Sequence, residues 1–207
     1  MKWPQVSFSE GFVDATGGNP KIQTGDYRSE GPLAIVDQGA NPVAGYSDNM
    51  GLKCEARLPC IAFGDHTKAL KYIDFPFALG ADGVKVLVPR DDLDAKFAYY
   101  ALSLFHFPER TGYMRHFKYL QRAKLPLPPL SEQKRIAAIM DKADAIRRKR
   151  RESLRLLDDF LRSVFLDMFG DIKSKRSRFP FHPVRPYVTA SSGKSSSRSA
   201  GRGGLPA

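Results

Sequence analysis

Cysteine is scarce in this 207-residue chain, which has two, Cys54 and Cys60. Two thiols give no basis for the disulfide framework of a small secreted domain. The first residues also lack the charged segment and apolar stretch of a signal peptide, so we expect a cytoplasmic protein with reduced thiols. Together with His66 they make three unevenly spaced potential ligands, which do not fit the spacing of zinc sites. We therefore predict no metal.

Other patterns that carry chemistry are missing too. No apolar run is long enough to cross a membrane, so no membrane partner is expected. The glycine-rich stretch Thr16–Pro20 lacks the lysine of a phosphate-binding loop, and no nucleophile–base or carboxylate pair can be argued from spacing. A stand-alone enzyme acting on DNA would need a metal-binding carboxylate cluster or a cofactor-binding glycine strand. We therefore predict no catalytic residue and no cofactor in this chain.

Acidic residues are absent from the end of the chain. The net charge of +11 divides into +1 for residues 1–130, +2 for residues 131–171 and +8 for residues 172–207. Because the first 130 residues are nearly neutral, any binding of nucleic acid by them must come from a local patch. The segment 101–130 is one candidate, with five basic residues against Glu109: Arg110, Arg115, Lys118, Arg122 and Lys124.

Residues 1–126 are predicted to form one globular α+β domain. Turn-forming residues separate short apolar runs, which is typical of strands joined by loops. The runs are Leu33–Val36, Cys60–Phe63, Lys71–Phe75 and Val84–Pro89. One helix is expected from Asp92 to Leu102, because apolar residues recur three and four positions apart. Its predicted apolar face consists of Leu93, Phe97, Tyr100 and Leu104.

Two loops of this domain have unusual polar chemistry. Gly64–Thr67 follows an apolar run, and Gly112–Lys118 mixes basic and aromatic residues. The functional interpretation is a surface that faces DNA, with basic groups for phosphates or guanine edges and His or Thr for hydrogen bonds. The structural alternative is that Asp65 and Thr67 close a turn, that His66 is a structural hydrogen-bonding group, and that Tyr113 and Phe117 belong to the core.

A long helix is predicted from about Ser131 to Gly170. Pro128 and Pro129 precede it, Ser131 is the expected N-cap, and Gly170 is the expected stop. Its apolar residues alternate in steps of four and three, which forms a heptad seam with Arg147 and Arg150 in its middle. The seam residues predicted to pair with another helix are Ile136, Met140, Ala143, Leu154, Leu157, Leu161, Val164 and Met168.

The length of this helix bears on how it is covered. At 1.5 Å per residue it spans roughly 58 Å, which is longer than the helices of a compact domain. Its apolar stripe is therefore expected to pair with another helix, and folding back on its own domain is the alternative. Residues 127–171 form this junction and helix. Residues 172–207 are predicted to be a disordered basic tail, which either attracts nucleic acid non-specifically or is an extension without a function.

Several stretches together resemble the specificity (S) subunits of type I restriction-modification systems. Leu125–Ile136, with its Leu-Pro-Pro-Leu-Ser-Glu-Gln core, resembles the junction between a target-recognition domain and a conserved spacer helix. Asp141–Asp171, which ends in Phe-Gly-Asp, resembles that helix and its exit. Other segments resemble one subclass of recognition domain: Gly45-Tyr46, Phe63–Thr67, Lys71–Phe75 and Gly112–Lys118. The resemblance covers roughly residues 10–171.

The resemblance implies a non-catalytic subunit that recognises double-stranded DNA. A full S subunit carries two recognition domains and two antiparallel spacer helices, and each domain reads half of a split site. Methylation by S-adenosylmethionine-binding modification subunits, and ATP- and Mg-dependent cleavage with restriction subunits, would belong to partner chains. This chain has one domain and one helix, so we expect either a half-subunit that forms a homodimer or a truncated remnant.

Four loops are predicted to touch DNA: Asn19–Lys21, Gln38–Tyr46, Gly64–Thr67 and Gly112–Lys118. The candidate DNA-binding residues within them are Lys21, Gln38, Tyr46, His66, Thr67, Arg115, His116 and Lys118. Spacing does not assign them to bases or phosphates. The alternatives from other classes are the stand-alone enzyme and a protein-interaction module that uses the long helix without binding DNA.

Overall fold

The computed structural model describes residues 3–81, 83–108, 114–171 and 176–177. By its internal contacts the chain divides into two compact units, Met1–Arg148 and Lys149–Ala207. The first unit contains all the sheets of the globular domain and the beginning of the long helix. The fold class is the predicted one, α+β with a long helix.

Three sheets form the β part of the first unit. The four-stranded antiparallel sheet has the order β2-β8-β5-β6, and the three-stranded sheet has the order β4-β3-β7, in which β3 and β7 are parallel. The strands are β2 (Phe12–Asp14), β3 (Leu33–Val36), β4 (Gly45–Ser47), β5 (Cys60–Gly64), β6 (Leu70–Ile73), β7 (Phe77–Leu79) and β8 (Val84–Pro89). The predicted runs Leu33–Val36, Cys60–Phe63 and Val84–Pro89 thus lie in β3, β5 and β8, whereas Lys71–Phe75 overlaps β6 but extends beyond its end at Ile73.

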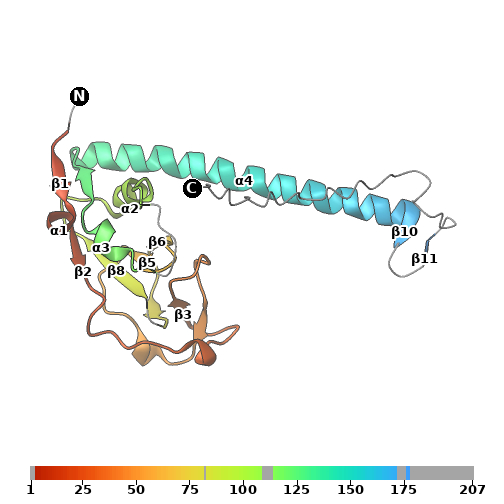
Figure 1. The fold of residues 1–207 in the computed structure, drawn as a ribbon, viewed down its shortest axis with the longest axis horizontal. Coiled ribbons are helices and arrows are strands. Elements are labelled where there is room, and N and C mark those ends of the chain that lie inside the picture. Colours follow the sequence, from red (N-terminus) through yellow and green to blue (C-terminus); the bar gives the residue numbers. More distant parts are fainter. Residues whose placement is uncertain (1–2, 82, 109–113, 172–175, 178–207) are drawn as a thin grey trace, which may run out of the picture. The chain divides into compact units, whose positions relative to one another are not determined.

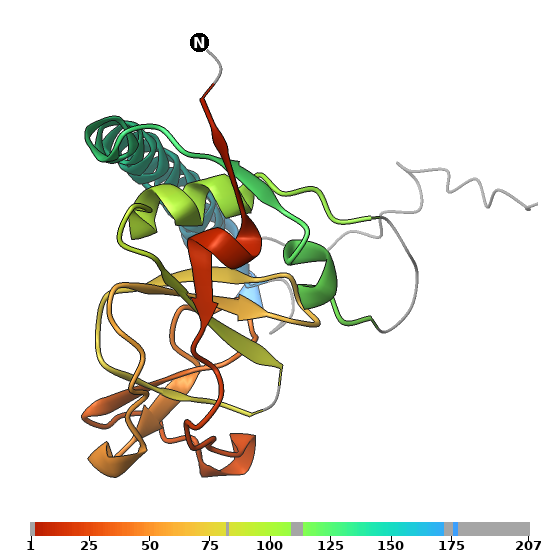
Figure 2. The same cartoon turned by 90° about the vertical axis from the view of Figure 1, so that its left-hand side faces the viewer.

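The third sheet closes the domain on itself. β1 (Gln5–Ser7) pairs antiparallel with β9 (Lys124–Pro126), so the two ends of the domain lie side by side. The amide of Leu127 adds a bond of 2.8 Å to the carbonyl of Pro4. This pairing lies next to the start of the long helix, whereas residues 15–52, in red and orange, gather at the opposite end of the domain (Figures 1 and 2).

Three short helices complete the domain. They are α1 (Phe8–Gly11), α2 (Ala95–Ser103) and α3 (Phe117–Leu120), and two 3-10 turns lie at Thr24–Asp26 and Met50–Leu52. The side chain of Asp94 caps α2 by accepting from the amides of Lys96 and Phe97, so the helix begins later than the predicted Asp92. Leu104, which was predicted to be on its apolar face, is 68% exposed.

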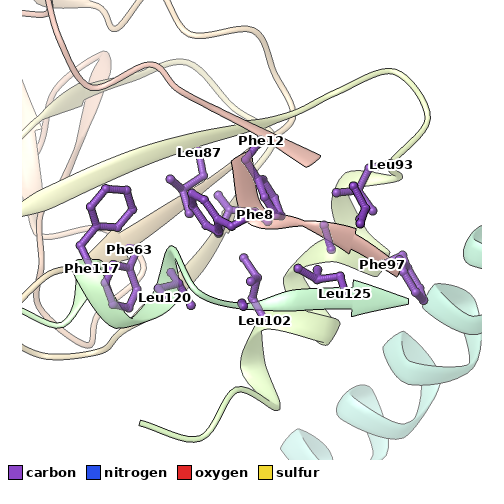
Figure 3. Packing of buried hydrophobic residues seen from close by; sticks show 14 of the residues in the cluster. Phe8, Phe12, Phe63, Leu87, Leu93, Phe97, Leu102, Phe117, Leu120 and Leu125 are labelled. Carbon is purple, nitrogen blue, oxygen red and sulfur yellow. The ribbon is translucent and has the colours of Figure 1, made fainter. Parts of the chain in front are cut away.

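The largest core lies between the four-stranded sheet and the helices. Figure 3 shows Phe8 between Phe12 on one side and Phe117 and Phe63 on the other, with Leu102 and Leu125 in the same cluster. Phe8 and Phe12 stack with ring centroids 5.0 Å apart, and Phe8 meets Phe117 edge-on at 5.8 Å. Large side chains from six elements are thereby removed from water, and each contributes roughly 1.5–3 kcal/mol.

The long helix, α4, runs from Leu130 to Phe169. It begins one residue earlier than predicted, because the carbonyl of Pro129 accepts from the amides of Glu132 (2.9 Å) and Gln133 (3.0 Å). The prediction of Ser131 as the N-cap was therefore wrong. Gly170 follows the last helical residue with φ 79°, in the left-handed region that favours glycine, and this confirms the predicted stop.

Gln133 anchors the start of α4 in the domain. Its side chain is completely buried. Its Nε2 donates to the carbonyls of Asp92 (2.9 Å) and Pro128 (2.8 Å), and its Oε1 accepts from the amide of Asp94 at 2.8 Å. Ala137, one turn on, is also buried in the main core. The first turns of α4 thus belong to the packed domain.

After α4, β10 (Gly170–Asp171) pairs antiparallel with β11 (Arg176–Ser177). The rest of the predicted disordered tail, 172–175 and 178–207, lies outside the described residues, and so do 109–113. Of the helices in the part of the chain that the structure describes, none combines the length and the apolar character needed to cross a membrane.

Candidate nucleic-acid interface

Four loop segments meet at the end of the four-stranded sheet where β5 ends and β8 begins. They are residues 37–40 after β3, 64–68 after β5, Gly83 before β8, and 114–118 leading into α3. We refer to these segments together as the loop face. Two of the four loops predicted to touch DNA, Gly64–Thr67 and the described part of Gly112–Lys118, lie within it, as does the beginning of Gln38–Tyr46.

Asp65 holds three of these segments together. Its amide donates to the carbonyl of Gly83 at 2.7 Å, and its own carbonyl accepts from the amide of His116 at 2.8 Å. Its carboxylate turns inward and accepts from the amide of Phe117 at 2.7 Å. Asp65 is buried, so its carboxylate binds within the protein and does not add negative charge to the exposed surface. This is the structural role that the sequence left open for it.

Thr67 joins the fourth segment. Its hydroxyl donates to the carbonyl of Gln38 and accepts from the amide of Ala69 at 3.2 Å. Below the same loop, the buried ammonium of Lys71 donates to the carbonyl of Asp37 at 2.8 Å. Burial lowers the pKa of Lys71, although Asp37 opposes the shift. Both side chains fix the loop after β3 in place.

The two histidines of the loop face differ. The Nδ1 of half-buried His66 donates to the carbonyl of Met114 at 3.1 Å, which ties the turn to the segment before α3. His116 is buried, and its ring meets Phe107 edge-on at 5.6 Å. Its pKa is lowered, first by burial and then by the charge of Lys68. Because it is buried, His116 does not offer its ring to DNA in this conformation.

The fully exposed charges on the loop face have one sign, whereas its acidic residues, Asp37 and Asp65, are half-buried and buried. Among the described residues of its four segments, the exposed charged side chains are all basic: Lys68, Arg115 and Lys118. Lys68 has φ 62°, a left-handed conformation that is uncommon outside glycine. Its ammonium lies 5.6 Å from the ring centroid of Phe107. Uncommon backbone conformations of this kind often mark functional loops.

The other candidate DNA-binding residues lie around the three-stranded sheet. Lys21 is exposed and bridges to Leu79, which in turn pairs with Val36 at the edge of the loop face. Tyr46 pairs with Ala34 on the opposite side of β3, and its Cβ packs against the position of Gly31. The structure therefore brings Lys21 close to the loop face but holds Tyr46 apart by backbone pairing.

The residues of α4 predicted to pair with a helix fall into two groups. Ile136 packs against the main core of its own domain, and Met140 is half-buried. Ala143 is exposed, and the later side chains are exposed by 37–58%. These later residues are Leu154, Leu157, Leu161, Val164 and Met168.

The two cysteines and the potential metal ligands can be located within the described residues. Cys54 and Cys60 are free and buried, and burial raises the pKa of Cys60 to about 12. Within the described ranges, no group of three or more His, Cys, Asp or Glu side chains could hold a metal ion.

The sequence interpretation missed two residues. Lys68 was not among the candidates because nothing in a Gly-Asp-His-Thr-Lys turn indicates that the lysine is the exposed, left-handed residue. Gln133 was taken for an ordinary first-turn residue. The two prolines and the glutamine at the start of the helix were the sequence features that could have indicated this role. The partners of Gln133 at Asp92 and Asp94, however, lie about 40 positions earlier in the chain.

Comparison with known proteins agrees with this architecture. Residues 56–156 match the family described as "Type I restriction modification DNA specificity domain". The chain is also 26% identical over 137 residues to the type I restriction enzyme EcoR124I/EcoR124II specificity subunit of Escherichia coli. That match covers 60% of this chain and 34% of the relative.

Two solved structures share the fold. The S subunit of a type I restriction-modification system from M. genitalium is 20% identical, with a TM-score of 0.54, over 84% of this chain and 47% of that one. A chain from a study of complex assembly and conformational transition in the type I R-M system is 23% identical, with a TM-score of 0.53, over 80% and 45%.

This chain therefore spans less than half the length of the relatives it matches. The matched family segment begins before β5, contains most of the loop face and extends into α4. Residues 56–156 are therefore similar to the type I restriction modification DNA specificity domain, and the chain shares its fold with a solved S subunit of a type I restriction-modification system.

Proposed function

We propose that this chain recognises one half of a bipartite site in double-stranded DNA, as the non-catalytic specificity component of a type I restriction-modification assembly in the cytoplasm. The observation that carries the proposal is the loop face. There Asp65 turns its carboxylate inward and the exposed charges are basic. Basic side chains on fixed loops can contact both phosphates and base edges.

Within the loop face, Arg115 and Lys68 are the proposed DNA contacts, and Thr67 and His66 position them. The side chains of Thr67 and His66 donate hydrogen bonds to the carbonyls of Gln38 and Met114, which lie on neighbouring loops. An arginine that reads a guanine edge contributes about 1–3 kcal/mol of discrimination, whereas a phosphate contact adds affinity for every sequence. Lys118 and Lys21 are proposed to be phosphate contacts beside them.

The chain is proposed to act as a homodimer that also docks modification subunits. The apolar side chains exposed along Leu154–Met168 support pairing of α4 with a second copy. Two-fold symmetry would give a palindromic split site. S-adenosylmethionine, ATP and Mg would be bound by the modification and restriction subunits, so the isolated chain is expected to transfer no methyl group.

Selection from a random duplex pool, with modification subunits present, tests this function. We expect enrichment of one motif with two conserved parts and a fixed gap. Arg115→Ala should relax one base position, and Lys68→Ala should weaken binding. Arg90→Ala is the matched control, because Arg90 is exposed and follows β8 at the end away from the loop face, roughly 20 Å along the strand. Enrichment of no motif, or equal losses for all three variants, would contradict the proposal.

A further inference from the structure

Lys68 has a backbone conformation that is unfavourable for a lysine. Its φ of 62° lies in the left-handed region, where the Cβ of any residue except glycine is crowded. Main-chain bonds hold the turn closed: the amide of Lys68 donates to the carbonyl of Gly64 at 2.8 Å, and the amide of Gly64 donates to the carbonyl of Ala69 at 2.8 Å. Glycine and asparagine adopt this conformation more readily. A lysine in this position therefore indicates that its side chain is used there.

The ammonium of Lys68 lies over the ring of Phe107, 5.6 Å from its centroid, which is within the range of a cation–π contact. Lys68 is exposed, and within the described ranges its ammonium forms no ion pair. By contrast, Lys96 lies over the ring of Tyr72 but is also paired with Asp141 at 3.5 Å. The charge of Lys68 is therefore available to an anion from outside the chain.

The ring of Phe107 is itself fixed by the domain. It stacks on the ring of Phe63, with an interplanar angle of 11° and centroids 5.8 Å apart. Phe63 belongs to β5 and is completely buried. Phe105 and His116 meet the same ring edge-on, with centroids 4.9 Å and 5.6 Å away. Three other rings thus set the position of Phe107, which can in turn fix the end of a long, flexible side chain.

We propose that Phe107 is a positioning residue, whose ring holds the ammonium of Lys68 in place to bind one phosphate of the DNA backbone. This deepens the proposed DNA contact of Lys68 and depends on it. A lysine that is free in solution loses side-chain freedom when it binds, and this loss weakens the contact. Over the ring, part of that freedom is lost before DNA binds. The negative face of the ring attracts the ammonium without neutralising its charge.

The chemistry of the ammonium favours a phosphate over a base edge. An ammonium is a compact point charge, which suits a phosphate, whereas the planar fork of an arginine suits the two acceptors of a guanine edge. Arg115 supplies such a fork elsewhere on the loop face. Lys68 therefore adds affinity for every sequence, and Arg115 selects among sequences.

A double-mutant cycle in the full chain, with modification subunits present, tests the proposal. The probes are two labelled duplexes of equal length, the one enriched from the random pool and one of random sequence. Lys68→Asn removes the charge but tolerates the left-handed backbone. It should weaken binding of both duplexes roughly tenfold, and should reduce the slope of log affinity against log salt by about one.

Phe107→Leu should weaken binding about two- to fivefold, which is the range expected for an exposed cation–π contact. In the Lys68→Asn background the same change should have no further effect, because Phe107 acts through Lys68. Phe105→Leu is the matched control and should leave the affinity unchanged. Phe105 packs against the same ring, and among the described residues no cation lies over its own ring.

Replacement of Phe107 with pentafluorophenylalanine separates electrostatics from packing. The fluorinated ring has nearly the same shape, but the charge of its face is reversed. We expect it to weaken binding at least as much as Phe107→Leu without lowering the melting temperature. A role in packing alone would leave the affinity unchanged.

The outcomes separate this inference from the proposed function. If no motif is enriched, the proposed function fails. If Lys68→Asn weakens binding but the fluorinated ring does not, or if the losses at the two positions add, only the positioning role of Phe107 fails. A loss confined to the enriched duplex would assign Lys68 to a base edge and overturn the phosphate contact. If Lys68→Asn changes neither affinity, the inference is overturned, while an enriched motif still supports the proposed function.

Discussion

Replacement of Gln133 should have the largest effect on stability of any single polar substitution in the domain. Gln133→Leu keeps the approximate volume of the side chain but removes its three hydrogen bonds. The amide of Asp94 and the carbonyls of Asp92 and Pro128 then lose their hydrogen bonds to Gln133 at a site that is shielded from water. Each such loss costs about 1–3 kcal/mol.

The expected total is a loss of about 3–5 kcal/mol in the free energy of unfolding, which is a large fraction of the 5–15 kcal/mol typical of a domain. Urea unfolding followed by the fluorescence of Trp3, the only tryptophan, gives this quantity. Lys134→Ala is the control, because Lys134 is the exposed neighbour on the same helix, and its change should lie within about 0.5 kcal/mol.

Gln133→Glu sharpens the test. It retains the acceptor for the amide of Asp94 but places a carboxylate oxygen against two carbonyls. We expect it to be at least as destabilising as Gln133→Leu at pH 7, and to recover stability at pH 5 as the buried carboxyl takes up a proton and becomes a donor. A loss below about 1 kcal/mol for Gln133→Leu would refute the anchoring role.

The remaining predictions concern titration, burial and thiol reactivity. The folded-state pKa of His116 lies below the ordinary 6.5. Its contribution to the free energy of unfolding is therefore constant above about pH 6.5, and stability falls as the pH drops through that value. Thermal melts should show a smaller pH dependence in His116→Phe but not in the exposed control His106→Phe. Lys71→Met leaves the carbonyl of Asp37 without its donor and should cost about 1–2 kcal/mol in urea unfolding, and an unchanged or raised stability would contradict this. Cys60 should resist an aromatic disulfide reagent at pH 8 and react only after unfolding, because burial raises its pKa to about 12; rapid reaction of the native protein would contradict the buried position.

The elements with a continuous local signal were predictable. β5 is an uninterrupted apolar run, β8 is interrupted by Lys85 alone, and both are bounded by turn residues, as buried strands require. α4 was predictable because no glycine or proline interrupts it between Leu130 and Gly170. The α+β class followed from these elements.

Features that depend on distant parts of the chain were not predictable. His116 looks like a polar loop residue until the carbonyl of Asp65, 51 positions earlier, accepts from its amide and draws it inward. Leu104 fits the apolar spacing of α2, yet the helix ends before it and leaves it exposed. The start of α4 differed by one residue because the carbonyl of Pro129 accepts the first main-chain bonds of the helix, which places Ser131 inside the first turn.

The pairing of β1 with β9 has a consequence for how this domain could be exchanged. Entry and exit of the chain are neighbours, joined from Pro4 to Leu127, which is the geometry that lets a folded unit be transplanted as a cassette. Gln133 lies outside that cassette and holds it by main-chain groups alone. A replacement domain of different sequence could therefore use the same attachment, so long as its backbone presents one carbonyl and one amide there, as Asp92 and Asp94 do. Chimaeras joined at residues 4 and 127 offer a direct route to new specificities on an unchanged helix.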